Sequence, residues 1–417
     1  MRRTLPFLTA LLVLLPAGVR AQFAPPEPAL GGYVKTLALA YDRPEARLFL
    51  DRGGRLFYSR FRLEGRLPLG RDLSLHGAAE LEDYVGEGAG SFLLQRGGRG
   101  DAAWTPEWVL TDQEDLRTRL FLDRFYLEAY SGRWTLTLGK QRVAWGSGQF
   151  WNPTDLFDPF GPLSLDPEDR PGSDALRVDY QLGPVSVLTG VVSVGAKPSW
   201  YEDTRDRSVQ ALRLRTHLGD WDIAVLAAQD RGDGVAGLDI TGYVGDAGVY
   251  LESAVVRHPG LETITAEGGG TLTLRTGDHD TWLEAAAGGS YGLESGWTIR
   301  GEVFFNGGGA GPWEGPDGLA TPLTRYDWRR VARGDILAPA RLYAAGFTSW
   351  QLTPLITPEL GVLANLSDGG LALLPGLDWS VLSDLRLTAG AQVYLAETTD
   401  EFSYYPLSGY LLLKYSF

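Results

Sequence analysis

Alternation of apolar and polar residues, in runs of roughly 9 to 13 residues, dominates the chain from residue 31 to its end. In residues 385 to 395, for example, Leu385 and Leu387 alternate with Arg386 and Thr388. A period of two places alternate side chains on opposite faces of a strand, so the runs predict β-strands with one apolar face. Soluble β-sandwiches alternate in the same way, so alternation alone does not separate a sandwich from a transmembrane barrel.

The connections between the runs distinguish these two folds. We predict eighteen strands, which span residues 31–42, 55–67, 72–84, 118–130, 133–144, 175–183, 185–194, 208–218, 220–229, 234–243, 246–256, 280–291, 296–306, 340–351, 355–366, 370–380, 384–395 and 407–417. Every even-numbered connection is short, whereas the odd-numbered connections include four long loops, at residues 85–117, 145–174, 257–279 and 307–339. Outer-membrane barrels have short periplasmic turns, longer external loops and an even number of strands. Sixteen strands are the alternative, because the pattern is weakest between residues 234 and 277.

The predicted fold is therefore all-β: a single transmembrane antiparallel β-barrel of about 18 strands that occupies residues 31–417. A closed barrel satisfies every backbone hydrogen-bonding group within the hydrocarbon without using helices. Barrels of about sixteen to eighteen strands leave an aqueous lumen instead of a core filled by side chains. Residues 22–30 form only a short lead before the first strand, so we expect no plug domain.

Both ends of the chain indicate export to the outer membrane. Residues 1–21 predict a signal peptide, because Arg2 and Arg3 precede an apolar run and small residues surround the expected cleavage site at Ala21. Residues 408–417 alternate and end in Phe417. This segment looks like the terminal strand of bacterial outer-membrane proteins, which the barrel-assembly machinery recognises. We expect a location in the outer membrane, in contact with lipid and lipopolysaccharide.

Composition argues against several other functions. The net charge of −14 disfavours a nucleic acid as partner. The chain has no Cys and only four His, so we expect no metal site and no cofactor. An outer-membrane hydrolase would need a Ser beside a His. His76 and His217 share the parity of the lumen, and the sequence places no partner Ser beside either. We therefore expect no enzyme activity.

The parity opposite to the apolar residues defines the side chains expected to face the lumen. The predicted pore-lining residues are Arg60, Arg62, Glu64, Arg66, Glu80, Arg177, Asp179, Arg213, Arg215, Arg300, Glu302, Arg386 and Lys414. An Arg or Lys that faced lipid at the midplane would cost roughly 2 to 4 kcal/mol, so the segregation of charge onto one face indicates orientation. Basic residues outnumber acidic residues in this set. The mixture of charges favours either a weak preference for anions or cross-strand ion pairs that brace the wall.

The loop after the fifth predicted strand, residues 145–174, is the predicted constriction. It has the position at which general bacterial porins carry a loop that folds inward, and its WNPTD segment favours ordered turns. The candidate constriction residues are Gln141, Arg142, Trp145, Trp151, Asn152 and Asp155. Continued alternation from Trp134 to Leu138 would point Lys140 and Arg142 toward the lipid. We therefore expect a β-bulge, or the end of the membrane-spanning part of the strand, to turn these two side chains inward. A brace for the barrel wall is the alternative role of this loop.

Three short motifs in and before this loop carry a family resemblance. They read GKQR at residues 139–142, WGSG at 145–148 and WNPTD at 151–155, and the segment DRFYL at residues 123–127 precedes them. Together they resemble a family of porin-like bacterial outer-membrane β-barrels that is grouped with alginate-export-type barrels. Lys140 stands where the family pattern has Arg, which puts any bidentate contact at that position in doubt. The resemblance covers about forty residues, and it implies a barrel that transports solutes.

These observations favour an outer-membrane porin for passive or substrate-selective diffusion of small hydrophilic solutes or sugars. The strand number, the lack of a plug and the polar lumen support this function. The alternative is a non-conducting barrel that binds or anchors surface polysaccharide. Assembly into a homotrimer is left open, because strand parity does not reveal which part of the wall would make the contact.

Overall fold

The computed structural model describes residues 27–43, 53–86, 103–113, 115–157, 161–165, 172–195, 202–203, 208–257, 261–265, 271–275, 281–309, 338–397 and 400–417. The predicted signal peptide lies outside the described residues, as do most of the loop predicted at 307–339 and parts of the other three long loops. Within the described ranges, no helix is long and apolar enough to cross a bilayer.

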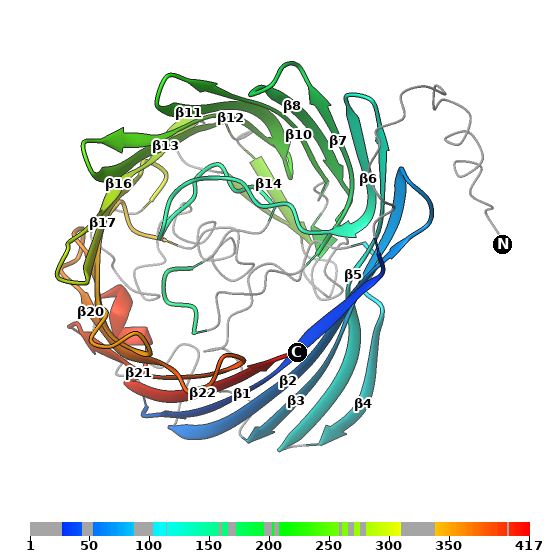
Figure 1. Cartoon of the computed structure of the whole chain (residues 1–417). Coiled ribbons are helices and arrows are strands. Elements are labelled where there is room, and N and C mark those ends of the chain that lie inside the picture. The colour runs from blue at the N-terminus through cyan, green and yellow to red at the C-terminus, as the bar shows by residue number, and fades with distance from the viewer. Residues whose placement is uncertain are drawn as a thin grey trace.

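Antiparallel strands form a closed barrel (Figure 1). In order around the ring they are β1 (Ala29–Tyr41), β2 (Gly54–Pro68), β3 (Leu73–Gly86), β5 (Leu116–Ser131), β6 (Trp134–Gln141), β7 (Ser173–Gln181), β8 (Val187–Ser193), β10 (Val209–Leu218), β11 (Trp221–Asp230), β12 (Asp233–Val244), β13 (Ala247–Arg257), β16 (Thr281–Gly292), β17 (Trp297–Asn306), β18 (Leu342–Trp350), β19 (Ile356–Asn365), β20 (Leu371–Ser380), β21 (Leu385–Leu395) and β22 (Ser408–Ser416). β22 pairs with β1 from Ser416 opposite Tyr33 to Ser408 opposite Tyr41, which closes the ring. The ring has eighteen strands, so the predicted number is confirmed and the alternative of sixteen is wrong.

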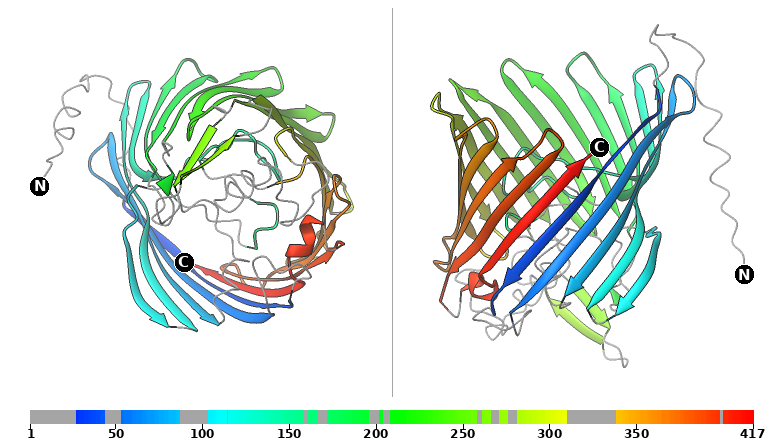
Figure 2. Two further views of the ribbon diagram at one scale, coloured as in Figure 1. Left: turned by 180° about the vertical axis from the view of Figure 1, so that it is seen from behind. Right: turned by 60° about the horizontal axis from the view of Figure 1, so that its bottom comes forward.

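The two faces of the wall differ as the alternation predicts. On β2, Phe57 and Phe61 are exposed on the outer face, whereas Tyr58 and Arg60 are buried on the inner face. The short turns lie at one end of the barrel, together with the chain's C-terminus, as the right-hand view in Figure 2 shows. This arrangement suits a barrel whose outer band faces hydrocarbon and whose inner wall is polar.

Tight turns and aromatic side chains mark the short-turn end. Gly219 and Gly245 have φ angles of 62° and 61°, in the left-handed region that glycine adopts without strain in two-residue hairpin turns. Trp297 directly follows a short turn, and its ring stacks on that of Trp350 with 5.5 Å between the ring centroids. Aromatic rings at this level are expected where a barrel wall meets the membrane interface.

Some segments predicted as loops contain strands. β4 (Glu107–Gln113) lies within the loop predicted at 85–117 and pairs with the outer part of β5, from Leu116 to Phe121. β6 pairs only with the C-terminal half of β5, from Phe125 to Ser131. The same edge of the N-terminal half of β5 is therefore open to β4. A separate three-stranded sheet contains β9 (Glu202–Asp203), β14 (Leu261–Thr265) and β15 (Thr271–Arg275). It includes part of the loop predicted at 257–279.

The strand predicted at 133–144 ends earlier than expected, at Gln141 of β6. Gly139 has a φ of 125°, and a Cβ atom there would lie 2.4 Å from the backbone oxygen of Phe125. This glycine conformation breaks the alternation, because Lys140 and Gln141 are both buried although they are consecutive. Lys140 then pairs with Asp174 of β7 at 3.1 Å. The expected re-aiming of Lys140 therefore occurs at a glycine that L-residues with side chains could not replace without strain.

Candidate functional site

The chain leaves the barrel wall after β6 and enters the ring of strands. We call residues 142–157 the inward loop; in Figure 1 it is the teal segment that continues from β6 inside the barrel. Its backbone contacts Glu252 of β13, and its Trp151 stacks on Phe304 of β17 with 5.3 Å between the centroids. The loop also packs on the strands between these contacts, from β7 to β12, so it lies inside the barrel along the inner wall from β6 to β17.

Glu252 is the first anchor of the inward loop. One oxygen of its carboxylate, Oε2, accepts hydrogen bonds from the backbone N–H groups of Ser147 and Gly148, at 3.0 and 3.1 Å. The other, Oε1, accepts from the backbone N–H and the hydroxyl of Thr154, both at 2.7 Å. The side chain is completely buried. A buried carboxylate is tolerated when several donors satisfy it, and charge-assisted bonds of this kind are the stronger ones.

Glu302 of β17 is the second anchor. Its Oε2 accepts from the backbone N–H groups of Gln149 and Phe150, at 2.8 and 3.1 Å, and its Oε1 accepts from that of Trp151 at 2.8 Å. The Tyr250 hydroxyl also donates to Oε2. Three successive N–H groups therefore surround one carboxylate, as in the backbone nests that bind anions elsewhere. The loop's backbone is the anion-binding element here, and the barrel wall supplies the anion.

The glycines of the WGSG motif permit this path. Gly146 has a φ of 94°, and a Cβ atom there would lie 2.5 Å from Oδ1 of Asn152 and 2.8 Å from the carboxylate oxygens of Glu252. At Gly148, a Cβ atom would lie only 1.9 Å from the backbone oxygen of Trp151. The spacing between WGSG and WNPTD is thus explained by a tight fold in which the two motifs pack on each other and on the same carboxylate.

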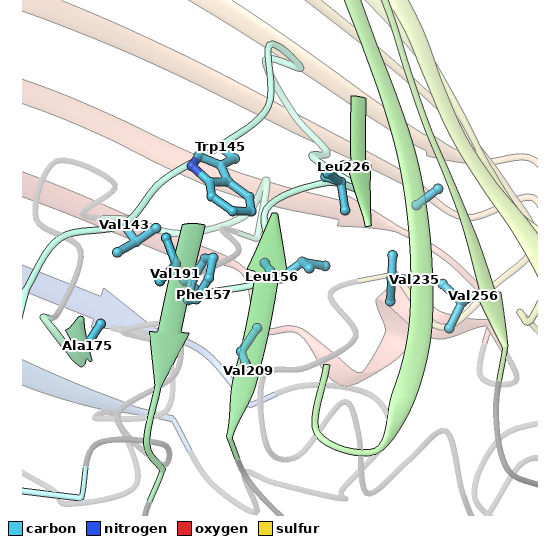
Figure 3. Close-up of a cluster of buried hydrophobic side chains, with 12 residues drawn as sticks. Val143, Trp145, Leu156, Phe157, Ala175, Val191, Val209, Leu226, Val235 and Val256 are labelled. Carbon is cyan, nitrogen blue, oxygen red and sulfur yellow. The ribbon is translucent and has the colours of Figure 1, made fainter. Parts of the chain in front are cut away.

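Apolar side chains hold both ends of the inward loop. Trp145 and Phe157 meet edge to face, with 5.0 Å between their centroids, in a buried cluster with side chains of β7 to β13 (Figure 3). The guanidinium of Arg213 lies over the Trp145 ring at 5.7 Å, a cation–π geometry. In the middle of the loop, Trp151 is only 2% exposed and packs between Phe304 and Tyr343.

The structure brings most of the predicted constriction residues together. Trp145, Trp151, Asn152 and Asp155 belong to the inward loop, and the backbone N–H of Asp155 donates to the Asn152 carbonyl at 3.0 Å, which forms a turn. Gln141 lies at the base of the loop, where its side chain donates to the backbone oxygens of Thr137 and Ala175. Arg142 is exposed at the start of the loop and makes none of the anchoring contacts described above.

Many predicted pore-lining residues form ion pairs on the inner wall. Arg62 pairs with Glu80, with Asp123 at 2.7 Å and with Glu64 at 3.0 Å, and Arg60 lies 3.5 Å from Glu80. Further pairs join Arg177 to Asp179 at 2.8 Å, Arg213 to Asp239 at 3.0 Å and Arg386 to Asp378 at 3.3 Å. Arg66 lies opposite His76, Arg215 opposite Ala224, and Arg300 lies over the Phe347 ring at 5.2 Å. These pairs agree with the bracing role considered above.

The register also aligns four basic residues that are directly opposite one another on neighbouring strands. The row runs from Arg60 on β2 through Lys35 on β1 and Lys414 on β22 to Arg386 on β21. We call it the basic row. Like charges directly opposite are unfavourable, so the wall has to compensate them. The Tyr33 ring lies 5.1 Å from the Lys35 ammonium and 4.8 Å from that of Lys414. The Arg386 side chain is 56% exposed, so this end of the row faces solvent.

The expectation that no Ser accompanies His76 is wrong. The Ser74 hydroxyl lies 3.1 Å from Nε2 of His76, because residues two apart on β3 share a face, a spacing that was visible in the sequence. Glu128 approaches the same nitrogen, at 3.4 Å. A Ser-His-carboxylate relay needs the hydroxyl and the carboxylate on different ring nitrogens. Ser74 is also 1% exposed, so the arrangement does not make a hydrolase site.

Several functional residues were not found from the sequence. Glu252 and Asp239 lie on the inner face of β13 and β12, and Asp239 accepts a hydrogen bond from the Ser147 hydroxyl. The available signal for Glu252 was that it is the only charged residue in the run from Val249 to Val256. Arg231, in the β11–β12 turn, donates to the Leu156 carbonyl at 3.2 Å and has a φ of 49°. Among the described residues, no group of three or more His, Cys, Asp and Glu is arranged to hold a metal ion.

Comparison with known proteins places this geometry in a class. No protein-family model matches the chain, and no curated protein sequence matches it. Similar solved structures include a BenF-like porin from Pseudomonas fluorescens Pf-5, with a TM-score of 0.54, 10% identity and coverage of 94% of this chain and 99% of that chain. OccAB4 of Acinetobacter baumannii has a TM-score of 0.54, 9% identity and coverage of 94% and 98%. OccAB1 of the same organism has a TM-score of 0.51 at 9% identity, with coverage of 94% and 96%.

At this level of identity the similarity concerns the fold. The chain has the closed eighteen-stranded antiparallel β-barrel of bacterial porins. In the part of the chain that the structure describes, no separate plug domain fills this barrel. The resemblance of the WGSG and WNPTD motifs to alginate-export-type barrels stays a prediction.

Proposed function

We propose that the chain forms a channel in the outer membrane for passive or substrate-selective diffusion of small hydrophilic solutes, sugars included, and that the inward loop is its constriction. The observation that carries the proposal is the attachment of the loop to Glu252 and Glu302, on strands far around the ring from β6. A loop held against the inner wall inside the barrel reduces the free cross-section of the lumen. A loop fixed to the rim would leave the lumen open.

The charges on the wall support a preference for anions in this channel. The basic row places four cationic side chains next to one another; two of them, Arg60 and Arg386, have carboxylate partners in Glu80 and Asp378, so the anion preference depends mainly on Lys35 and Lys414. Clustered charge of one sign raises the local concentration of counter-ions in a confined space. The ion pairs of Arg62, Arg177 and Arg213 brace the wall and contribute little net charge.

The outer surface of the barrel supports the proposed location and partners. Exposed apolar side chains on the outward parity suit contact with outer-membrane lipid and lipopolysaccharide. At the terminal strand, the Phe417 ring stacks on Phe61 at 6.0 Å, and the Phe417 backbone pairs with Gly32 in both directions at 3.0 Å. We expect the assembly machinery to recognise this strand before it closes the ring on β1. A homotrimer is tested by measuring the mass of the purified protein in detergent.

Planar-bilayer recording tests the proposed channel. Purified full-length chain should give discrete open-channel currents, and the reversal potential in a salt gradient should show anion preference. A barrel that inserts, as judged by heat-modifiable migration on a gel, but passes no current would contradict the proposal. The buried packing of the inward loop makes a sealed barrel that binds surface polysaccharide the competing function. That function predicts glycan binding without conductance.

A further inference from the structure

Three connections at the long-loop end of the barrel meet at one buried carboxyl group, that of Glu401. This residue begins the short 3-10 helix η5 (Glu401–Tyr404) between β21 and β22. The Tyr343 hydroxyl of β18 donates to Oε2 of Glu401, and the Asn365 side chain donates to the same oxygen at 2.8 Å. The backbone N–H of Glu401 donates to the Asp368 carboxylate at 2.9 Å. The hydrogen bonds therefore link η5 to the first residues of β18 and to the β19–β20 connection.

Tyr343 also packs against the inward loop. The Tyr343 ring lies 5.6 Å from the Trp151 ring and 6.5 Å from that of Phe304. Phe402, next to Glu401, belongs to the buried cluster that contains Trp151 and Tyr343. The Tyr343 hydroxyl also accepts the backbone N–H of Ala340 at 2.7 Å. Tyr343 therefore contacts both the Glu401 carboxyl and the Trp151 ring.

Glu401 has donors but no cationic partner in the part of the chain that the structure describes. Its side chain is buried, 6% exposed, and the titratable groups that act on it or are acted on by it are Tyr343, Asp368 and Tyr405, while Asp400, the preceding residue, acts on Asp368. None of these groups carries a positive charge, so the hydrogen bonds from Tyr343 and Asn365 are the stabilising contacts that these residues offer an ionised Glu401. Burial raises the pKa of Glu401 to about 8; the hydrogen bonds from Tyr343 and Asn365 lower it, and the Asp368 charge adds to the rise. Burial also raises the pKa of Asp368.

We propose that Glu401, Asp368, Asn365 and Tyr343 form a pH-dependent latch at the long-loop end of the barrel. When Glu401 is protonated, the latch holds η5 to Asn365 and Asp368 beside β19 and to Tyr343 of β18, and it keeps Tyr343 against Trp151. When Glu401 ionises, its buried charge and that of Asp368 repel each other, and the η5 segment detaches. The inward loop then loses the packing of Tyr343 against Trp151. The effect on permeation rests on the proposed function, whereas the opening of the latch does not.

The direction of the pH effect follows from the raised pKa. A detached Glu401 would titrate near its usual value of 4.5, and the latched one titrates near 8. The latched state therefore binds the extra proton, its full stability is present below pH 4.5, and it is lost as the pH rises through 8. The latch should be closed at pH 5 and weakened at pH 8.5.

Amide hydrogen exchange of the folded full-length chain tests the latch without requiring conduction. After correction for the intrinsic pH dependence of exchange, residues 400–405 should exchange about tenfold or more faster at pH 8.5 than at pH 5. Glu401→Gln should remove this difference, because a neutral amide cannot ionise. Glu397→Gln, which removes an exposed carboxylate from the same connection, should retain the difference. Equal protection at both pH values in the unaltered chain would overturn the proposal.

Single-channel recording tests the effect on the pore. With the external side raised to pH 8.5, the current should increase or fluctuate more, and Glu401→Gln should respond no longer. If the unaltered chain conducts but Glu401→Gln shows the same pH response, the latch is wrong and the channel stands. If no chain conducts while exchange still shows the pH difference, the channel is wrong and the latch stands. Asp368→Asn, which lowers the repulsion, provides a second variant if Glu401→Gln does not fold.

Discussion

Replacement of Glu302 by Gln should detach the middle of the inward loop and enlarge the channel. The carboxylate accepts three backbone N–H groups, from Gln149, Phe150 and Trp151, and it is buried. Glutamine keeps one acceptor oxygen and turns an NH₂ donor toward one or two of these N–H groups. A hydrogen bond to a charged group contributes about 1.5 to 3 kcal/mol, so the loop should be weakened by roughly 3 kcal/mol. This shifts the ratio of detached to attached loop by about 100-fold.

Single-channel conductance and hydrogen exchange measure this effect together. Glu302→Gln should raise the conductance or its noise and speed amide exchange in residues 145–157. Glu359→Gln is the matched control, because it removes a carboxylate from the same lumen that makes no hydrogen bond to the loop. If Glu302→Gln left conductance and exchange unchanged, or if Glu359→Gln changed them equally, the anchoring role of Glu302 would be refuted.

Three further changes address other parts of the structure. Gly148→Ala places a Cβ atom 1.9 Å from the Trp151 carbonyl, so the loop should shift and the barrel should lose its gel mobility at a lower temperature than the unaltered chain; an unchanged transition would contradict this. Lys414→Gln removes one member of the basic row, so the reversal potential in a salt gradient should move toward cation selectivity, and a constant potential would exclude the row from the pathway. Phe417→Ala removes the ring that stacks on Phe61, so the yield of folded barrel in cells should fall several-fold, whereas an unchanged yield would show that recognition does not use this ring.

The barrel wall could be predicted because a bilayer restricts it strongly. Every backbone group must find a partner within the wall, and each side chain faces either lipid or lumen, so the period of two appears in the sequence itself. The strand positions around Gly219 and Gly245 follow from this pattern and from turn-forming glycines. β4 was not predicted because it depends on the edge of β5 beyond its pair with Lys140 of β6, and no local pattern shows where a neighbouring strand ends.

The candidate site could be predicted only in part, for a similar reason. The loop and its residues Trp145, Trp151 and Asn152 were recognisable from their composition, but the path of the loop was not. That path depends on Glu252 and Glu302, which are about a hundred residues or more away in sequence, with separations of 105 and 151 residues for two of their bonds. Glu302 was identified as a lumen residue, but its role as an acceptor for the loop's backbone required the register of β13 and β17. Contacts of such long range leave no periodic signal in the sequence.

The size of solute that passes the channel tests the central claim most directly, because the claim is that the inward loop sets the narrowest cross-section. Conductance should be recorded in the presence of polyethylene glycols of graded size for the unaltered chain and for the double variant Glu252→Gln/Glu302→Gln. The account predicts that the double variant admits larger polymers than the unaltered chain while its barrel remains folded by circular dichroism. The same exclusion limit in both proteins would contradict it.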